Sequence, residues 1–420
     1  MQKTPVFSKD FILVAIGQIV SIFGNQIVRY ALPLYLLNQT GSSLLFGTIM
    51  AFTLLPMVLL FPIGGLVADR VNKRNIMVFL DFTTAFLLLL FHLLLKKTDI
   101  VPLMAATMVV LYAIQGLYQP AVKASVPLLV AHRHIMKANS VVDVINSAAS
   151  MAGPVIGGLL FSSFGLTPIL YVSIACFFAS AVMEMFIHIP FEKAKPNGNI
   201  ALSALSDLKS SFHFMWKQQP ALWKISLLFA ASNLLLTSLL LIAPPVIITQ
   251  HLGFAPYTAG RLYGYLQGAM AAGAVLGGLL AGLLSGKLTA NSAPALLIGC
   301  CACVVSGGIA LQFLHAPMAV YLVLAVSSGL MLALHTLFQI QMMSYLQLLS
   351  PHHLMGKIIS CFLCVVMCTG PLGQFLYGAV FEHIGNSIFL PFYGAALAMA
   401  ALTVFSRRIF SGLDNLIQIT

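Results

Sequence analysis

Charged residues are scarce in this chain. Only 7% of its 420 residues are Asp, Glu, Lys or Arg, and only 10 of those are acidic. Hydrophobic residues make up 60%, which is more apolar surface than a soluble domain of this length can bury. The composition therefore excludes a soluble globular protein and indicates a chain whose solvent is lipid.

Common catalytic and nucleotide-binding motifs are also missing. The chain has no HExxH and no GxSxG, and the stretch from Gly282 to Lys287 is one residue short of a Walker motif. All seven cysteines fall inside apolar runs, where they behave as small hydrophobic residues. We therefore expect no enzymatic activity, no cofactor and no metal.

Basic residues outnumber acidic ones, and the formal net charge is +11. They are spread over many short turns, where they lie beside anionic lipid headgroups, so we expect no nucleic-acid partner. When the apolar runs are threaded through a bilayer from a cytoplasmic amino terminus, Lys96 and Lys97 alone among the basic turn residues fall on the outer side. The positive-inside rule then predicts that both termini are cytoplasmic.

The apolar runs predict an all-α membrane protein. A helix needs about 20 residues to cross the hydrocarbon core. The sequence supplies twelve such runs, near 11–37, 43–67, 76–95, 100–121, 138–161, 168–190, 222–249, 258–285, 293–314, 317–346, 356–382 and 388–408.

One long polar stretch divides these runs into six and six. We expect an amino-terminal half at 1–190, a cytoplasmic linker at 191–221, a carboxyl-terminal half at 222–408 and a cytoplasmic tail at 409–420. The linker repeats apolar residues with helical spacing, which predicts an amphipathic helix on the membrane surface; a solvated linker is the alternative. The repeated residues are Leu205, Leu208, Phe212, Met215 and Trp216.

The two halves resemble each other in sequence. Four landmarks recur in order at offsets of 212 to 217 residues: Pro33 and Pro245, Gly41 and Gly253, Gly64-Gly65 and Gly277-Gly278, Gly153-Pro154 and Gly370-Pro371. Such a duplication predicts a binding site between the halves and alternating access by the rocking of one half against the other.

The turn after the second run carries a recognisable motif. Residues 64–74 read GGLVADRVNKR, which resembles motif A of the major facilitator superfamily. The resemblance implies the twelve-helix major facilitator fold with two pseudo-symmetric halves. It also implies a latch that holds one conformation of the protein. In this latch, glycines allow close helix contact, and an Asp lies near basic side chains and the amino end of a helix. The latch residues would be Gly64, Gly65, Asp69, Arg70, Lys73 and Arg74. A plain charged turn is the alternative.

A second motif lies in the fifth run. Gly153, Pro154, Gly157 and Gly158 resemble motif C, which in this superfamily is associated with drug-exporting antiporters. Proline kinks a helix and small residues permit close packing.

The fourth run departs from the family, because residues 111–115 lack the Arg of motif B. The resemblance therefore does not assign the route of proton coupling.

Further segments, among them Ala31-Leu32-Pro33 and Gln119-Pro120-Ala121, resemble the macrolide-efflux and siderophore-exporter branch. The resemblance implies a monomeric secondary transporter of the bacterial inner membrane that exports an amphipathic, macrolide-like compound by proton antiport, as in multidrug resistance. Alternatives of the same fold are a lysophospholipid flippase and a siderophore exporter. An alternative of another class is a non-transporting membrane scaffold or sensor.

Ionisable residues inside the apolar runs are candidates for proton coupling. Asp81, Asp143 and Glu184 each lie about 8 to 9 Å from the cytoplasmic end of their helices, at about 1.5 Å per residue. They fit either a proton relay or interfacial ion pairs. His335 titrates near neutral pH and fits a proton carrier, with a hydrogen-bonded packing residue as the alternative.

Polar residues recur on one side of the first run. Gln18, Ser21, Asn25 and Arg29 share a face at helical spacing, and span one lines the central cavity in the resembled family. A deep cation suits a substrate with an anionic or zwitterionic group, although Arg29 also fits a structural role at helix-end carbonyls.

Other polar residues complete the predicted sites. Asn233, Thr237, His335 and Gln339 are expected to line the substrate cavity from the second half. Arg261 and Glu382 lie near the outer ends of their runs and are expected to pair as an outer gate.

The latch hypothesis makes a direct prediction. Asp69→Asn removes the negative charge of motif A and should lower transport with little loss of folded protein, because the exposed turn contributes little to stability. Flux should be compared with the amount of protein in the membrane; unchanged flux would remove the latch hypothesis.

Overall fold

The computed structural model describes residues 9–130, 135–189, 214–284, 292–350, 355–385 and 387–410, and within them the chain is helical with no strand. The first six spans are α1 (Lys9–Thr40), α2 (Ser43–Arg70), α3 (Lys73–Leu94), α4 (Ile100–Leu129), α5 (Ile135–Phe164) and α6 (Leu166–Glu184).

The later spans follow a short π-helical turn, η2 (Phe214–Gln218). The seventh span is made of four consecutive segments: α8 (Pro220–Ser232), η3 (Asn233–Thr237), α9 (Ser238–Val246) and η4 (Ile247–His251). The rest are α10 (Pro256–Leu283), α11 (Ser292–Phe313), α12 (Pro317–Leu349), α13 (Met355–His383) and α14 (Leu390–Phe410).

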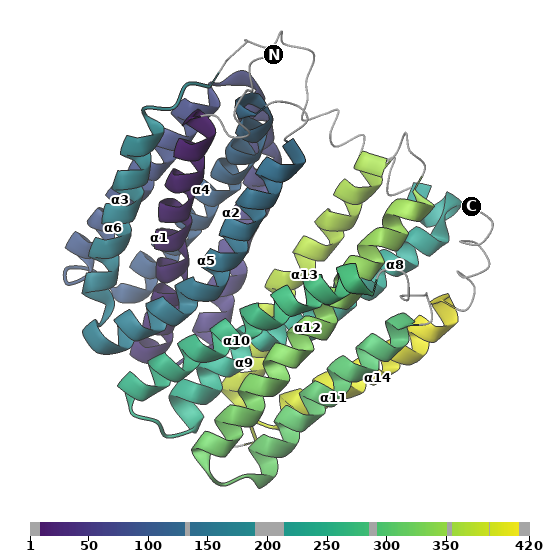
Figure 1. The fold of residues 1–420 in the computed structure, drawn as a ribbon. Coiled ribbons are helices and arrows are strands. Elements are labelled where there is room, and N and C mark those ends of the chain that lie inside the picture. Colours follow the sequence, from purple (N-terminus) through teal and green to yellow (C-terminus); the bar gives the residue numbers. More distant parts are fainter. Residues whose placement is uncertain are drawn as a thin grey trace. The chain divides into compact units, whose positions relative to one another are not determined.

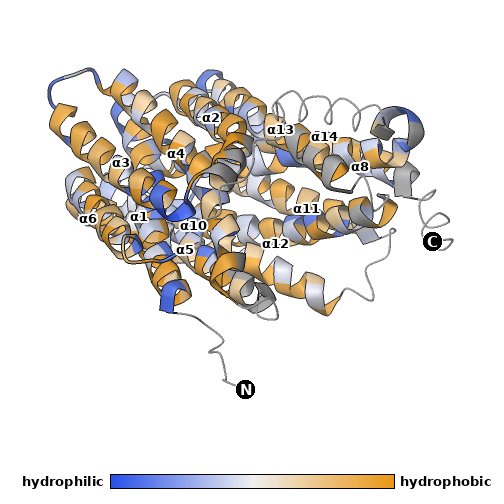
Figure 2. Cartoon of the chain, turned by 90° about the horizontal axis from the view of Figure 1, so that it is seen from above, coloured by the Kyte–Doolittle hydropathy of each residue, from blue (hydrophilic) through white to orange (hydrophobic). Residues whose placement is uncertain are grey.

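These helices confirm the predicted all-α membrane fold. Within the described residues, 11 helices are long and apolar enough to cross a membrane, and the 29-residue α13 supplies a further helix of membrane-spanning length. Figure 2 shows hydrophobic residues along the helices and hydrophilic ones mainly toward their ends. Of the predicted linker helix, Leu205, Leu208 and Phe212 lie outside the described residues, whereas Met215 and Trp216 belong to η2.

Local sequence explains where several helices end. Gly41 and Gly253, a pair of the internal repeat, both have positive φ, at 64° and 68°. Only glycine adopts this conformation without strain, so each can turn the chain directly between two spans. At the next turn, the side chain of Asn72 accepts a hydrogen bond from the backbone N of Arg74 at 3.0 Å and so caps the amino end of α3.

The chain forms two compact units. Unit 1 contains Met1–Gly41, Phe52–Lys195 and Phe254–Gly268; unit 2 contains Ser42–Ala51, Pro196–Gly253 and Ala269–Thr420. In unit 1, α1 packs against α5 and α6, and α3 packs against α4 and α6; α1, α3 and α6 can be followed side by side in Figure 1. In unit 2, α11 packs against α12 and α14.

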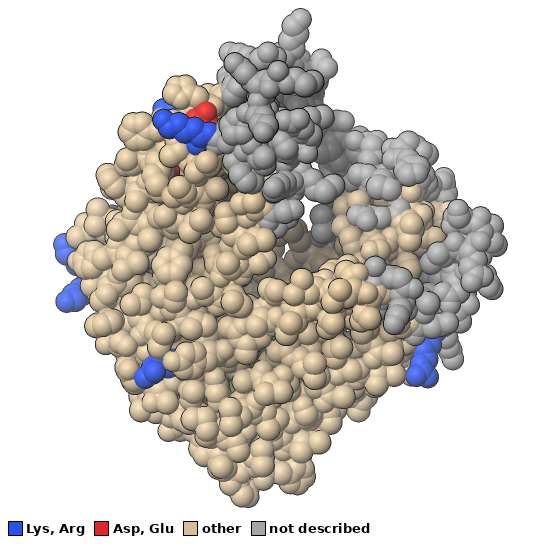
Figure 3. Space-filling model, viewed as in Figure 1, with Lys and Arg blue, Asp and Glu red and all other residues tan. Residues whose placement is uncertain are grey.

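The described surface is apolar over wide areas. Large side chains such as Leu59, Phe79 and Leu397 are 69%, 69% and 75% exposed. On the face drawn in Figure 3, charged side chains occupy a few places and most of the described surface carries none. Lipid, which is as apolar as these side chains, is the solvent that such a surface requires.

The two adjacent glycines of motif A have different surroundings. A Cβ atom on Gly64 would lie 2.7 Å from the carbonyl oxygen of Gly116 and 2.9 Å from Cα of Leu117, because α2 and α4 touch there through their backbones. A Cβ on Gly65 would meet no described atom within 4 Å. Close helix contact therefore depends on Gly64 and not on Gly65.

We predict that Gly64→Ala lowers stability by about 1 to 3 kcal/mol, because backbone atoms must move apart to admit the methyl group. Gly65→Ala should leave stability unchanged or raise it slightly, because alanine is the better helix former. Thermal unfolding midpoints of both variants in the same detergent measure the difference. Equal midpoints would show that α2 and α4 do not touch at Gly64.

Candidate functional site

Two acidic side chains are buried inside unit 1. Asp81 on α3 is 2% exposed, and Glu184 at the end of α6 is 0% exposed. Sequence position placed both residues near the membrane interface, where water or basic loops would reach them. The structure instead encloses them among α1, α3, α4 and α6.

Hydrogen bonds connect these two carboxyl groups, on α3 and α6, to side chains of α1 and α4. The hydroxyl of Ser21 on α1 donates to Oδ1 of Asp81 at 3.1 Å. The hydroxyl of Tyr118 on α4 donates to Oε1 of Glu184 at 2.8 Å, and Nε2 of Gln18 on α1 donates to the Tyr118 oxygen at 2.5 Å. We call Gln18, Ser21, Asp81, Tyr118 and Glu184 the buried carboxyl network.

Helices α1 and α6 lie close together beside this network. A Cβ on Gly17 would lie 3.5 Å from Cγ of Glu184, which is ordinary van der Waals contact. The Ser180 hydroxyl donates to the carbonyl of Gly17 at 3.1 Å, which holds α6 against α1 at the same level. Gln18 and Ser21 are three residues apart on α1 and therefore face the network together.

The network contains two acids and, among the described residues, no basic partner. Neither Asp81 nor Glu184 forms an ion pair with a described side chain, and the atoms Asp81 Oδ2 and Glu184 Oε2 are buried without a hydrogen-bond partner there. Burying an unpaired carboxylate costs far more than burying a neutral carboxyl group. The geometry therefore suits carboxyl groups that hold protons.

A small polar cavity of about 50 Å³ adjoins the network in unit 1. One water needs roughly 10 to 15 Å³ of such volume, so the cavity has room for more than one. Its lining includes Ser21, Asp81 and Tyr118 from the network and continues to Asn25 and Gln115. Asp81 is thus next to a space that water can occupy.

Arg29 lies on the same helix, two turns beyond Ser21. Its Nη1 donates to Oε1 of Gln115 at 2.7 Å, and its guanidinium carbon lies 4.1 Å from the ring centre of Tyr112. A cation–π contact and an amide oxygen partly compensate the charge without neutralising it. Both partners belong to residues 111–115 of α4, the stretch that lacks the Arg of motif B. This stretch therefore contacts a cation from α1, Arg29, in place of one of its own.

The motif A residues lie at the junction of α2 and α3. Asp69 and Arg70 are the last residues of α2. Their side chains, and that of Asp143 on α5, are not among those that the structure describes. Lys73 begins α3, and Arg74 follows it with a half-buried side chain. The latch therefore stays a prediction.

The motif C glycines contact two different helices within unit 1. A Cβ on Gly153 would clash with the Gln26 side chain of α1, and one on Gly158 would lie 2.9 Å from the carbonyl oxygen of Gly260 on α10. Tyr30 strengthens the second contact, since its hydroxyl donates to the same Gly260 oxygen at 2.6 Å. Pro154 lies inside α5, and Gly157 faces the Tyr30 ring. These small residues pack α5 against α1 and α10.

His335 in unit 2 is a buried, hydrogen-bonded side chain. It is 1% exposed, its Nδ1 lies 3.3 Å from Nε2 of Gln339, and its Nε2 lies 3.3 Å from the Ser232 hydroxyl. Because an amide N–H can only donate, Nδ1 accepts and Nε2 carries the proton. A neutral ring satisfies both contacts, which favours the packing interpretation of this residue.

The polar residues of the seventh span lie in its π-helical segment. Asn233 and Thr237 bound η3, and Oγ1 of Thr237 is buried without a hydrogen-bond partner among the described residues. The widened turn frees the carbonyl of Leu235, which accepts a hydrogen bond from the Tyr377 hydroxyl at 2.9 Å. π-helical turns often mark functional positions, so this segment remains a candidate part of the substrate cavity.

The proposed gate residues have separate partners. Arg261 in unit 1 donates to the hydroxyls of Tyr257 and Tyr265 at 3.2 and 3.4 Å. Glu382 in unit 2 accepts hydrogen bonds at 3.0 Å from the Ser42 hydroxyl and from the backbone N of Leu44, where it caps the amino end of α2. Pairing between Arg261 and Glu382 stays a prediction.

Sequence reasoning missed Tyr118, which connects Gln18 with Glu184. Tyrosine in an apolar run is common, and nothing in the local pattern distinguishes this one. A signal was nevertheless present, because a buried tyrosine hydroxyl needs a partner and unpaired acids were already evident in other runs.

Comparison with known proteins agrees with this architecture. Residues 14–374 match the family described as Major Facilitator Superfamily. The chain belongs to the major facilitator superfamily. The family is the one that the motif A resemblance implied, and the described helices are those of a multi-pass membrane protein.

Individual relatives are distant. The chain is 26% identical over 226 residues to the uncharacterized MFS-type transporter YfiS of Bacillus subtilis, covering 53% of each protein. It is 22% identical over 191 residues to macrolide efflux protein A of Streptococcus pyogenes, covering 45% of this chain and 47% of the relative. The chain thus matches about half the length of these curated relatives.

A solved structure supports the fold across the whole chain. The crystal structure of a bacterial homolog of the human lysosomal transporter Spinster matches with a TM-score of 0.68 and 15% identity, covering 99% of this chain and 98% of that one. At such low identity the likeness establishes the fold alone.

Tyr118 provides a test of the buried carboxyl network. Tyr118→Phe removes the hydroxyl that donates to Glu184 and accepts from Gln18, and it should lower stability by about 1 to 3 kcal/mol because buried polar groups lose their partner. Tyr35→Phe is the matched control, since the hydroxyl of Tyr35 has no hydrogen bond among the described residues. Thermal unfolding in detergent compares the two; equal midpoints would contradict the network.

Proposed function

We propose that this transporter exports an amphipathic organic compound by proton antiport through rocker-switch alternating access. One observation carries the proposal: Asp81 and Glu184 are buried together in unit 1 with no cationic partner among the described residues. Such a pair is expected to take up a proton when it is enclosed and to lose it when water reaches it. This is what coupling to a proton gradient requires.

The proton site and the expected cargo site are close enough to influence each other. Asp81 lines the same small cavity as Asn25 and Gln115, and Gln115 is hydrogen-bonded to Arg29. A cargo group at Arg29 would change the polarity and hydration of this cavity. We infer that cargo binding and proton binding are coupled there.

Arg29 also suggests the chemistry of the cargo. Its described partners are an amide and an aromatic ring, so its positive charge is available to an anionic or zwitterionic group. The similarity to macrolide efflux protein A supports export of a macrolide-like compound. The charge of Arg29 also fits a lysophospholipid flippase or a siderophore exporter, which we retain as the second candidate function.

A non-transporting scaffold or sensor is less consistent with the chain. Such a protein has no evident need for motif A or for unpaired buried acids.

We further propose that the transporter is a monomer in a bacterial inner membrane. Both termini would lie in the cytoplasm, in accord with the distribution of its basic turns.

The test is flux driven by a pH gradient in liposomes that contain the purified protein. A macrolide, a catecholate siderophore and a fluorescent lysophospholipid serve as parallel cargoes. We expect gradient-dependent movement of one of these cargoes, which identifies the branch. We also expect at least a tenfold weaker affinity for any anionic cargo in Arg29→Ala, since a charge-assisted hydrogen bond contributes roughly 1.5 to 3 kcal/mol. Movement of lysophospholipid without a gradient would favour the flippase.

Neutral variants separate coupling from transport. Asp81→Asn and Glu184→Gln mimic permanently protonated acids, so they should lose gradient-driven accumulation while retaining exchange of labelled for unlabelled cargo. His335→Gln is the control and should keep gradient-driven flux. Full accumulation in the Asp81→Asn, Glu184→Gln double variant would overturn the assignment of the proton site.

A further inference from the structure

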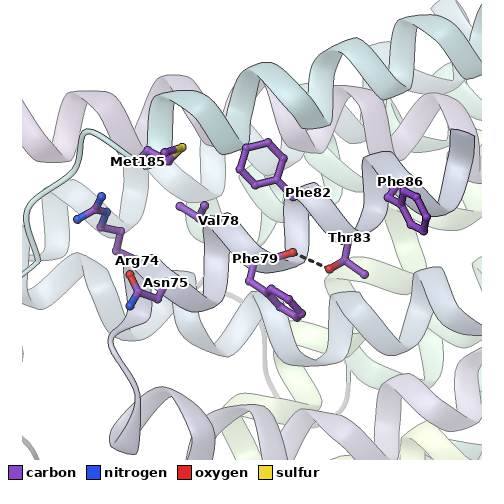
Figure 4. A pocket seen from close by; sticks show the side chains of 8 residues that line it. All are labelled: Arg74, Asn75, Val78, Phe79, Phe82, Thr83, Phe86 and Met185. Atoms are coloured by element: carbon purple, nitrogen blue, oxygen red, sulfur yellow. Dashed lines mark hydrogen bonds between the residues drawn. The ribbon is translucent and has the colours of Figure 1, made fainter.

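The outer face of α3 carries a groove that the proposed function does not use. Its volume is about 540 Å³, and it is lined by Arg74, Asn75, Val78, Phe79, Phe82, Thr83, Phe86 and Met185. Seven of these residues lie along a single stripe of α3, and Met185 follows α6 (Figure 4). The groove therefore runs along one helix, in the direction in which that helix crosses the membrane.

Most of the groove is apolar. Phe79 and Phe86 are 69% and 65% exposed, and Phe82 is held edge-to-face against Phe178 of α6 with ring centres 5.5 Å apart. The hydroxyl of Thr83 donates to the carbonyl of Phe79 at 2.7 Å, as drawn in Figure 4, so its hydrogen is not available to a ligand. This part of the groove matches a hydrocarbon chain.

One end of the groove is polar. Arg74 and Asn75 lie there, in the first turn of α3, and Nε of Arg74 is buried without a hydrogen-bond partner among the described residues. A guanidinium group binds phosphate oxygens through paired N–H donors, and an amide can add another. This end matches an anionic headgroup.

The length of the groove fits one leaflet. Arg74 and Phe86 are twelve residues apart, which corresponds to about 18 Å along a helix. Half the hydrocarbon core of a bilayer is roughly 15 Å thick. A lipid whose phosphate lies at Arg74 can therefore place one acyl chain along the phenylalanines as far as the middle of the membrane.

We propose that this groove is a binding site for an anionic phospholipid, with the phosphate at Arg74 and one acyl chain on Val78, Phe79, Phe82 and Phe86. Charge complementarity selects an anionic lipid over a zwitterionic one. Under the proposed topology, the polar end lies at the cytoplasmic leaflet, where anionic lipids are concentrated. The site does not depend on the identity of the cargo.

Lipid retention tests the proposal. The purified transporter is exposed to micelles with equal amounts of phosphatidylglycerol and phosphatidylcholine, and retained lipid is measured by native mass spectrometry. We expect preference for phosphatidylglycerol, lowered about tenfold in Arg74→Gln, because one charge-assisted contact is lost. Lys73→Gln removes a neighbouring charge that does not line the groove, and it should keep the preference.

A second measurement reports on the acyl chain and does not alter Arg74. Phe79→Trp places a fluorophore in the groove, and phosphatidylglycerol with a brominated acyl chain should quench it more than brominated phosphatidylcholine does. The native chain, with Trp216 and Trp223 alone, gives the background. Val78→Trp should fill the groove and lower lipid retention.

Several outcomes would overturn the proposal. Equal retention of the two lipids by the native chain would mean that there is no anionic-lipid site. Equal loss in Lys73→Gln and Arg74→Gln would mean that general surface charge, and not the groove, attracts the lipid. Equal quenching of Phe79→Trp by both brominated lipids would mean that the groove holds unselected bilayer lipid.

Discussion

The structure depends on the absence of water in its surroundings. In lipid, each backbone polar group must be satisfied within the chain, which is why the described residues are helical. Side-chain hydroxyls follow the same constraint. Thr84, Ser226 and Thr403 donate to carbonyl oxygens four residues earlier in their own helices, at 2.7 to 2.8 Å. Polar groups that are satisfied in this way are not available for contacts between helices, so the polar contacts that do join helices are informative.

The buried carboxyl network is one such contact in unit 1. It joins side chains from four helices, and its two acids have no described cation to neutralise them. In unit 2, by contrast, the neutral ring of His335 is satisfied by Ser232 and Gln339. The halves that repeat each other in sequence thus differ in chemistry: one holds unpaired acids and the other a satisfied histidine. Among the described residues, this asymmetry supports the proposal that the proton site lies in the first half.

Helix α3 connects the two proposals. Its inner face carries Asp81, and its outer face carries Phe79, Phe82 and Phe86. A protonation event and a bound lipid would therefore act on opposite sides of one helix. The glycine that brings α2 close to α4, Gly64, lies just before this helix in the chain. Small movements of α3 would be felt at both sites, because packed helices have little empty space into which to relax.

The sequence by itself determined the fold class and the order of the spans, because hydropathy is a local property and bilayer thickness fixes the length of each helix. Two predicted ends were wrong: α4 continues past 121 to Leu129, and α6 ends at Glu184 and not at 190. The motif at residues 64–74 indicated the family. The sequence also identified Asp81, Glu184 and Arg29 as unusual. Only the tertiary structure decided their partners: Ser21 for Asp81, Tyr118 for Glu184, Gln115 and Tyr112 for Arg29. These partners are 60 or more residues away in the chain, and local periodicity says which residues share a face but not which helix that face meets.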